Sequence, residues 1–553
     1  EKYPVQLELI TPSFNFDDLT SFLDATNFLK GEPSLHLRVQ GYFGDLNVEK
    51  LDVGFYDTKL KMTGNVKNLH VPENLFLDVK INDSYVNYEN VTKLLPALEL
   101  PDFKNVILSN FNAEYKGEPT KFSSKIFGDV NKGKVDGSLF LDLTKDKLVY
   151  DGKLETTNLN LSPVLGFATK LNTKSKVKGE GTSPNDLIAD AVINIKNSVF
   201  DIYSIKNLDL TTRADSQIIK MNVSSVIENA SLTSIAEFNF TDTSKTKYDI
   251  TADIKKLDLS RLTKDQKDSS NLNLAFSLNG TGLELDEMQN KFIAKLEPST
   301  YNDHEIPESQ IDLEISKTDT TRSIALNSDF LDFNIGGDFS LSKAIDLLDY
   351  QSEVITRIIS DKVDELNLLK EDTLINYTAG LDTSIAKENI SFNYNFVFKD
   401  FETIAKFLGL KKLDISGAGE GVVKNDNNSF GVTTNFKIDY FVNVFDTSVI
   451  YMSDLESKIS FSRNNIINDF NNLFGNISFK TDRVYANRNF DDISADFLFN
   501  KGKLYFNSGA KLDTNLSFYT DGSMILKPEF NDINLSNLFI TYNNQELFNE
   551  EPI

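Results

Sequence analysis

An alternation of apolar and polar residues with a period of two recurs along the whole chain. Between Leu331 and Leu341 the odd positions are apolar or glycine, and the even positions are Asp, Asn, Gly or Ser. Successive side chains of a β-strand point to opposite faces, so this pattern predicts a strand with one dry and one wet face. The same pattern occurs at 35–39, 51–55, 60–62, 139–143, 193–195, 238–240, 272–278, 392–398 and 432–440. Sheets with one wet face are usually antiparallel. The chain is therefore expected to be all-β and antiparallel.

Polar breaks separate the alternating runs where hairpin loops are expected. Clear examples are residues 144–147, 425–428 and 500–503, which are rich in Asn, Asp, Lys and Thr. With only 27 Gly and 13 Pro in the chain, many turns must use these polar residues instead. We therefore expect long strands joined by short polar turns, with no linker that divides residues 1–553.

One long amphipathic helix is predicted over 342–369, where Ile, Val and Leu recur at three- and four-residue spacing. Shorter helices are expected at 17–29, 91–97, 162–168 and 401–408. The favoured role of the long helix is to pack its apolar stripe on the dry face of the sheet. The alternative is a plug or gate over that face. A membrane-surface role fits poorly, because the polar side of the helix is mainly acidic.

A short phrase, Leu-x-Leu-Ser, marks the ends of several expected strands. It begins at Leu159 and Leu257, and a variant begins at Ile533. Each copy is expected to lead into a short apolar turn, and the first two are followed by strands that end on paired glycines. A looser relative combines 401–408 with the glycines of 415–421. The irregular spacing favours a sheet extended by hairpins over a strict solenoid.

Composition excludes several classes of protein. The 553 residues include 57 basic and 82 acidic side chains, for a net charge of −25, which argues against nucleic acid as a partner. The 40% of hydrophobic residues is too high for a disordered chain. The absence of Cys removes disulfides and thiolate chemistry. No run approaches the roughly 18 apolar residues of a membrane span, and we expect the chain to be a fragment of a longer protein.

Catalytic signals are weak, so we expect no enzyme activity, metal or cofactor. His36, His70 and His304 are isolated in the sequence. The glycine-rich segment 417–421 lacks the spacing of a dinucleotide loop and leads into another expected strand. Residues 426–430 begin like a calcium loop, but Phe430 occupies a ligand position.

Three features together resemble a known family. They are the Leu-x-Leu-Ser turn followed by Gly-x-Gly, the 331–341 strand that leads into the 342–369 helix, and Val-Thr-Lys-Leu-Leu-Pro at 91–96. Along essentially its whole length the chain is similar to the middle of TamB proteins of the Bacteroidetes type, in the AsmA-like superfamily of bridge-like lipid transfer proteins. The resemblance implies an elongated, twisted antiparallel sheet curled into an open trough (a β-taco or half-barrel) with few helices.

The resemblance also implies a place and partners. Such a protein lies in the periplasm, with an inner-membrane anchor that this chain does not contain, and reaches the outer membrane. Its partners would be phospholipid acyl chains and a BamA/TamA-type outer-membrane barrel. Two alternatives stay open: a scaffold that assists outer-membrane protein insertion, and a structural all-β protein with a filled core. A transmembrane barrel fits poorly without Trp girdles.

A lipid groove needs an apolar lining, and the dry positions of the central strands supply candidates. Each of them alone fits ordinary core packing, but no second set of apolar elements is evident in the sequence to cover them all. The expected lining residues are Leu272, Leu274, Phe276, Leu278, Leu331, Phe333, Ile335, Phe339, Leu341, Phe392, Tyr394, Phe396, Phe398, Val432, Phe436 and Ile438.

Overall fold

The computed structural model contains one antiparallel sheet in an all-β chain. It describes residues 3–20, 30–42, 44–69, 71, 74–96, 100–101, 103–318, 321–366, 377–408, 410–444, 448–513, 515–526 and 531–550. The 31 strands of these residues belong to a single sheet that is not closed into a barrel, which confirms the predicted fold class of an open antiparallel sheet. The chain divides into two compact units, Glu1–Leu257 and Asp258–Ile553.

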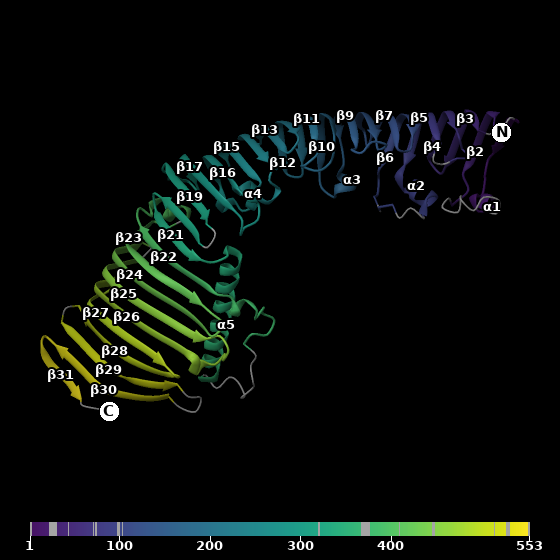
Figure 1. Ribbon diagram of the computed structural model, residues 1–553. Coiled ribbons are helices and arrows are strands. Elements are labelled where there is room, and N and C mark those ends of the chain that lie inside the picture. Colours follow the sequence, from purple (N-terminus) through teal and green to yellow (C-terminus); the bar gives the residue numbers. More distant parts are fainter. Residues whose placement is uncertain are drawn as a thin grey trace. The chain divides into compact units, whose positions relative to one another are not determined.

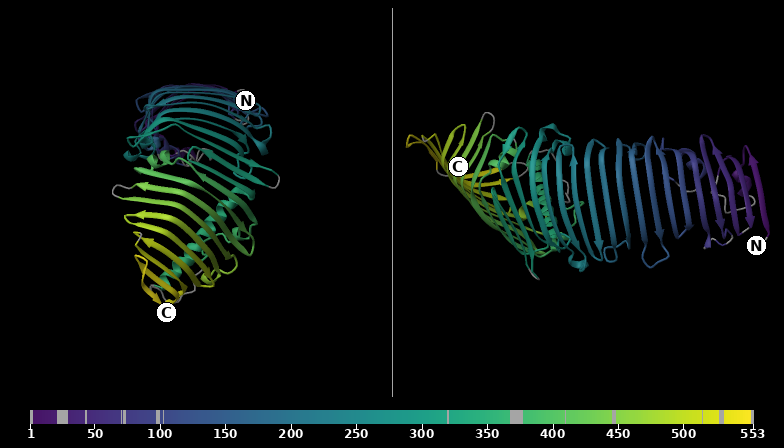
Figure 2. Two further views of the ribbon diagram at one scale, coloured as in Figure 1. Left: turned by 90° about the vertical axis from the view of Figure 1, so that its left-hand side faces the viewer. Right: turned by 90° about the horizontal axis from the view of Figure 1, so that it is seen from above.

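The first unit is a ladder of strands in which each strand pairs with the next along the chain (Figure 2). Its strands are β1 Pro4–Thr11, β2 Ser34–Tyr42, β3 Asp45–Phe55, β4 Thr58–Lys67, β5 Phe76–Asn87, β6 Ile107–Glu118, β7 Lys121–Val130, β8 Gly133–Asp142, β9 Val149–Leu159, β10 Thr169–Glu180, β11 Ile188–Phe200, β12 Tyr203–Asp215, β13 Ile218–Ile227, β14 Ala230–Asn239 and β15 Lys247–Leu257. Its helices are short: α1 Phe16–Thr20, α2 Tyr88–Leu94, α3 Ser162–Leu165 and the 3₁₀ turn Thr243–Lys245.

The second unit combines a similar ladder with the one long helix (Figure 1). Its strands are β16 Ser270–Thr281, β17 Gln289–Tyr301, β18 His304–Ile306, β19 Ser309–Lys317, β20 Arg322–Ser328, β21 Leu331–Asp338, β22 Ile390–Phe398, β23 Lys412–Asn425, β24 Ser429–Val444, β25 Val449–Asn464, β26 Leu473–Ala486, β27 Asn489–Asn500, β28 Lys503–Leu512, β29 Leu516–Leu526, β30 Asn531–Tyr542 and β31 Gln545–Glu550. Its helices are α4 Ser260–Thr263, α5 Leu341–Leu366 and α6 Glu402–Phe407, with 3₁₀ turns at Gln266–Asp268, Ile385–Lys387 and Phe470–Asn472.

The predicted polar turns join consecutive strands. Residues 144–147 lie between β8 and β9, residues 425–428 between β23 and β24, and residues 500–503 between β27 and β28. Several two-residue turns place a non-glycine residue at positive φ, as Asn131 (49°) and Lys132 (71°) do between β7 and β8. Such turns match the twist of paired strands, so polar residues suffice where glycine is scarce.

Helix α5 confirms the long predicted helix and its favoured role. It spans Leu341–Leu366, and the remaining predicted residues 367–369 lie outside the described residues. Leu347, Val354 and Ile358 on its apolar stripe are 0%, 0% and 1% exposed. Val354 and Ile358 belong to the predicted stripe and pack toward the sheet, whereas Ile345, Leu348 and Ile359 of the same predicted stripe are 46%, 42% and 45% exposed. The buried side of α5 is therefore narrower than the three- and four-residue spacing predicts, and it includes Leu347. The predicted helix at 17–29 begins in α1, and its residues 21–29 are not among those described.

One strand boundary was predicted wrongly. The strand expected over 331–341 ends at Asp338, and Leu341 already begins α5. The Asp286 carboxylate accepts hydrogen bonds from the Ser342 backbone N–H (3.0 Å) and hydroxyl. This carboxylate, which comes from the turn after β16, stabilises the start of the helix where alternation alone predicted more strand.

The third Leu-x-Leu-Ser copy is also placed differently from the prediction. The first two copies lead into α3 and α4, whereas residues 533–539 lie inside β30. In the first copy the Thr169 hydroxyl accepts from Leu161 N–H at 2.6 Å, and in the second the Ser270 hydroxyl accepts from Leu259 N–H at 2.7 Å. In the third copy β29 pairs with Leu535 and Asn537 and leaves a register shift between them, so a bulge replaces the turn.

Candidate functional site

Strand register shows which side chains share a face. Directly opposed residues of antiparallel strands point the same way, so successive pairs trace a row across a sheet. In the second unit, one apolar row crosses from β16 to β30. It consists of Leu278, Phe292, Leu313, Leu326, Phe333, Phe396, Gly419, Phe436, Ser457, Phe479, Ala495, Ser508, Thr520 and Leu538. We call this the apolar face of the second unit.

Most expected lining residues lie on this face. The register of the strand pairs places the following expected residues on this face: Leu274, Phe276, Leu278, Leu331, Phe333, Ile335, Phe392, Tyr394, Phe396, Phe398, Val432, Phe436 and Ile438. Leu272 lies at a register shift between Asn271 and Asn273 and is 9% exposed. Phe339 follows β21, and Leu341 is the first residue of α5. These two therefore reach the face from the connection and the helix.

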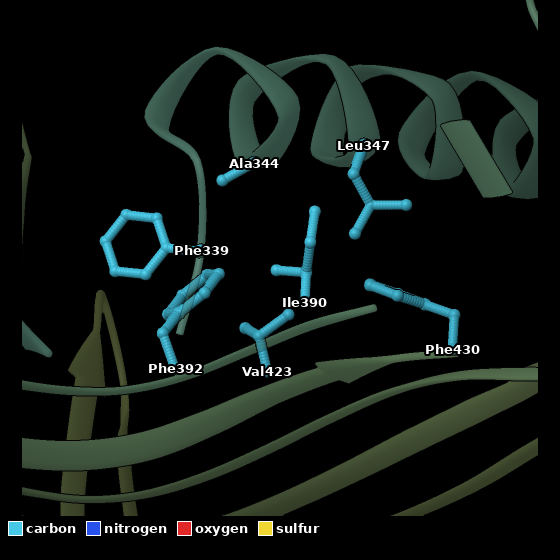
Figure 3. Close-up of a cluster of buried hydrophobic side chains, with 7 residues drawn as sticks. All are labelled: Phe339, Ala344, Leu347, Ile390, Phe392, Val423 and Phe430. Atoms are coloured by element: carbon cyan, nitrogen blue, oxygen red, sulfur yellow. The ribbon is translucent and has the colours of Figure 1, made fainter. Parts of the chain in front are cut away.

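Helix α5 covers one part of the apolar face (Figure 3). The covered cluster consists of Phe339, Ala344, Leu347, Ile390, Phe392, Val423 and Phe430. Four further expected lining residues pack against it, namely Ile335, Leu341, Tyr394 and Val432. Here the apolar side chains form a filled core. The expected residues outside both buried clusters of the described chain are Leu272, Leu274, Phe276, Leu278, Leu331, Phe333, Phe396, Phe398, Phe436 and Ile438.

Glycines in β23 form part of the apolar face that sequence reasoning did not assign to it. Gly417, Gly419 and Gly421 pair with Phe398, Phe396 and Tyr394 of β22. A Cβ atom at Gly419 would collide with the Phe396 ring, and one at Gly421 with the Tyr394 ring. The rings therefore lie across bare backbone. The sequence signal for this packing is glycine at alternate positions of a strand that neighbours an aromatic strand. The same packing explains why residues 417–421 are rich in glycine, so no nucleotide-binding loop is needed.

The first unit has an apolar face of its own. Its central row crosses every strand from β1 to β15. It consists of Leu7, Val39, Val48, Gly64, Val79, Tyr115, Ser124, Leu139, Gly152, Val177, Ala191, Thr212, Met221, Ala236 and Ile250. The row contains no charged residue. Apolar or small uncharged side chains therefore continue across the whole ladder.

Four aliphatic side chains on β7–β10 leave this face accessible at its middle. Ile126, Leu139, Leu154 and Val177 are 39%, 38%, 38% and 39% exposed. Ile126 and Leu154 lie beside Gly137, and Leu139 and Val177 lie beside Gly152. We call these four residues the aliphatic patch. Because the glycines add no side chain between them, the patch is a shallow apolar surface in contact with solvent.

One groove of the second unit crosses strands β22 to β27. It has a volume of about 710 Å³ and is lined by triplets of adjacent residues on strands from β22 to β26, such as Asn435, Phe436 and Lys437. On β27 it touches Ser494 and Asp496 but not Ala495, which belongs to the apolar row. The Lys437 ammonium and the Glu456 carboxylate lie 3.6 Å apart there. The central residues of these triplets, among them Phe396, Gly419 and Phe436, belong to the apolar row, so the groove is lined by residues of both parities.

Groups suited to catalysis are dispersed. The described residues contain no group of three or more His, Asp or Glu side chains placed to hold a metal ion. His36 Nε2 lies 3.4 Å from Glu8 Oε1, which also accepts a 2.7 Å hydrogen bond from Arg38. These bonds from Arg38 and His36 lower the pKa of Glu8. His304 lies in β18, and His70 is outside the described residues.

Comparisons with family models, curated proteins and solved structures found no match. Among the described helices, none has the length and apolarity needed to cross a membrane. The site is thus defined by its geometry: two ladders, each with one continuous apolar face.

Proposed function

We propose that the protein is a conduit along which lipid acyl chains move, as its resemblance to TamB proteins suggests. One observation carries the proposal, namely the row of apolar or small uncharged residues that crosses every strand from Leu7 in β1 to Ile250 in β15. All described strands belong to one sheet, so within the described chain no second sheet covers this row. An apolar surface of this extent calls for an apolar occupant.

Acyl chains match the surface in chemistry and scale. Each methylene removed from water contributes about 0.8 kcal/mol. At ~4.8 Å between strands, fifteen strands span on the order of 65 Å, about twice the ~30 Å hydrocarbon core of a bilayer. No single acyl chain covers that distance, so a lipid on this face would have to occupy successive positions along it.

The place and partners of this conduit follow from the same proposal. The protein would act in the periplasm between the inner and outer membranes, with a BamA/TamA-type barrel as its outer partner. Phospholipids would be its cargo. No proton transfer, metal or cofactor is needed for movement along an apolar surface, so the proposal assigns no enzymatic step.

A structural protein with a filled core is the second candidate, and the α5 clusters favour it locally. Phe392 and Val423 are 6% and 4% exposed beneath the helix, which leaves no accessible lining at that point. The aliphatic patch argues for the conduit, because its side chains are more than a third exposed. The two candidates therefore differ most clearly at the patch.

Site-specific photo-crosslinking tests the proposal. A photoreactive residue at Leu139 or Phe436, on the apolar faces, should capture lipid in cells. The matched controls are the adjacent positions Ser138 and Lys437, on the polar faces. Equal lipid labelling at the apolar-face and polar-face positions would contradict the conduit. So would the absence of lipid when organic extracts of the purified protein are analysed by mass spectrometry.

A further inference from the structure

A single arginine is buried beneath α5 without a partner for its charge. Arg463 is 2% exposed, and its Nε, Nη1 and Nη2 atoms have no hydrogen-bond partner. In β25 it is paired with Phe430 of β24 and Leu473 of β26, which are 3% and 2% exposed. The guanidinium thus lies on the apolar face, between two fully packed hydrophobic side chains.

Another buried arginine of this unit shows what a satisfied environment looks like. Arg322 is also 2% exposed, but it donates to the backbone carbonyls of Leu285, Asp286 and Met288. These carbonyls belong to the turn that caps α5. Arg322 therefore stabilises this turn with its guanidinium hydrogen bonds, whereas the guanidinium of Arg463 makes no such bonds to the backbone.

The polar groups near Arg463 do not replace a counter-ion. Burial lowers the pKa of Arg463, and the Tyr350 side chain of α5 opposes this shift through electrostatic attraction and a hydrogen-bonding contact. A tyrosine hydroxyl is neutral at pH 7, so it is no counter-ion for the guanidinium. On the same helix, Gln351 is 1% exposed. Its Nε2 donates to Asn465 at 2.9 Å, but its Oε1 has no partner. A guanidinium stays protonated in proteins, so a buried positive charge remains uncompensated.

We propose that Arg463 binds the acidic head group, a carboxylate or a phosphate, of an amphiphile whose hydrocarbon chain lies on the apolar face. The planar guanidinium fork matches both kinds of oxyanion. Phe430 and Leu473 are paired with Arg463 on the neighbouring strands, and Leu473 belongs to a buried cluster against which Phe461 and Phe499 pack. These apolar surroundings suit a hydrocarbon tail better than a free ion. The inference deepens the proposed conduit and rests on it. Since α5 covers the guanidinium, head-group binding must also displace this helix.

Thermal unfolding with short amphiphiles tests the inference. Decanoate, decyl phosphate, neutral decyl maltoside and inorganic phosphate are each added below any micellar concentration to the wild type, Arg463→Met and Arg463→Lys. Lys458→Met is the matched control, because it removes one charge from the exposed polar face of the same strand. Replacing an unpaired buried charge by Met should leave the unliganded protein folded, with an equal or higher melting temperature.

The expected result is an acid-specific effect that depends on Arg463. Decanoate and decyl phosphate should raise the melting temperature of the wild type and Lys458→Met by several degrees and change the hydrogen exchange of α5. Arg463→Met should bind both acids at least tenfold more weakly, and Arg463→Lys should be intermediate, because an ammonium cannot form the fork.

Other outcomes separate the two proposals. An unchanged acid response in Arg463→Met overturns the head-group site but leaves the conduit standing, provided that decyl maltoside still binds. Stabilisation by inorganic phosphate as strong as by decyl phosphate overturns the amphiphile and indicates a free-anion site. If no decyl compound, acidic or neutral, affects any of the proteins, both proposals fail.

Discussion

The glycines of β23 show how single residues shape the apolar face. Gly419 lies between Phe396 of β22 and Phe436 of β24 in the traced row, and both side chains occupy the space that a Cβ atom would need. In an exposed strand, valine is normally preferred to glycine. At this position the packing of the aromatic rings reverses that preference.

Gly419→Val should therefore destabilise the second unit, by about 1–3 kcal/mol as for other overpacked sites. Ala418→Val is the control, because it makes a similar change on the polar face of the same strand. Urea unfolding followed by far-ultraviolet circular dichroism compares the two. A Gly419→Val variant as stable as Ala418→Val would show that the rings move aside freely.

A charge on the aliphatic patch is the sharpest residue-level test of the conduit. Leu139 is 38% exposed, so Leu139→Asp stays hydrated in the lipid-free protein and should fold. An acyl chain that passes over the carboxylate would strip away its water, which costs several kcal/mol. In Leu139→Asp, lipid capture at positions past residue 139 along the apolar face should be lost, and so should the outer-membrane lipid barrier.

Ser138→Asp, on the opposite face, should change neither readout. Circular dichroism and expression must match the wild type before the result counts. Of the expected lining residues, Phe396 also suits a substitution by Asp, whereas Ile335→Asp would disrupt the packing against the α5 cluster. Normal lipid transport by well-folded Leu139→Asp would count against movement along this face.

At the scale of elements, α5 depends on a contact from a distant turn. Asp286 lies 56 positions before Ser342 in sequence and accepts two hydrogen bonds from it. Burial opposes ionisation, but these bonds outweigh it and lower the pKa of Asp286 from 3.8 to about 2. The folded state therefore favours the ionised carboxylate, and the start of α5 is tied to the β16–β17 connection.

This contact should make α5 sensitive to acid. Because the folded pKa is depressed, the stabilisation is present above about pH 4 and is lost as the pH falls toward 2, and it is worth at most about 2 kcal/mol. Asp286→Ala should lower the melting temperature at pH 7 and remove this part of the acid dependence. Asp346→Ala, on the exposed side of α5, should retain it. An identical pH profile for the two variants would refute the capping role.

At the scale of the whole molecule, one triple substitution is expected to be neutral, because the described residues contain no group of three or more His, Asp or Glu side chains placed to hold a metal ion. Replacing His36, His70 and His304 by Gln should leave lipid capture at Leu139 and Phe436 unchanged, because no proposed step needs a proton shuttle or metal. Crosslinking yields compared with the wild type check this. Loss of capture by a folded triple variant, with Leu139→Asp still active, would point to chemistry in place of a conduit.

Alternation by itself determined the dry and wet faces of the strands. Leu35, Leu139, Ile193 and Phe396 all lie on the apolar face of their unit, because side-chain parity within a strand is local geometry. The predicted helix and polar turns also follow from local spacing. Register between strands follows from short hairpins, which leave each strand little choice of partner.

Tertiary structure alone decided which part of the apolar face is covered and where the exceptions lie. The spacing of α5 predicted a packed stripe, but only contacts among segments far apart in sequence placed it over Phe392 and away from Phe396. The same holds for Asp286 at the start of the helix and for Arg463 beneath it. The alternation within β25 assigns Arg463 to the dry face. Its burial depends on α5, Phe430 and Leu473 meeting there. Burial is a property of the assembled layers and not of any one strand.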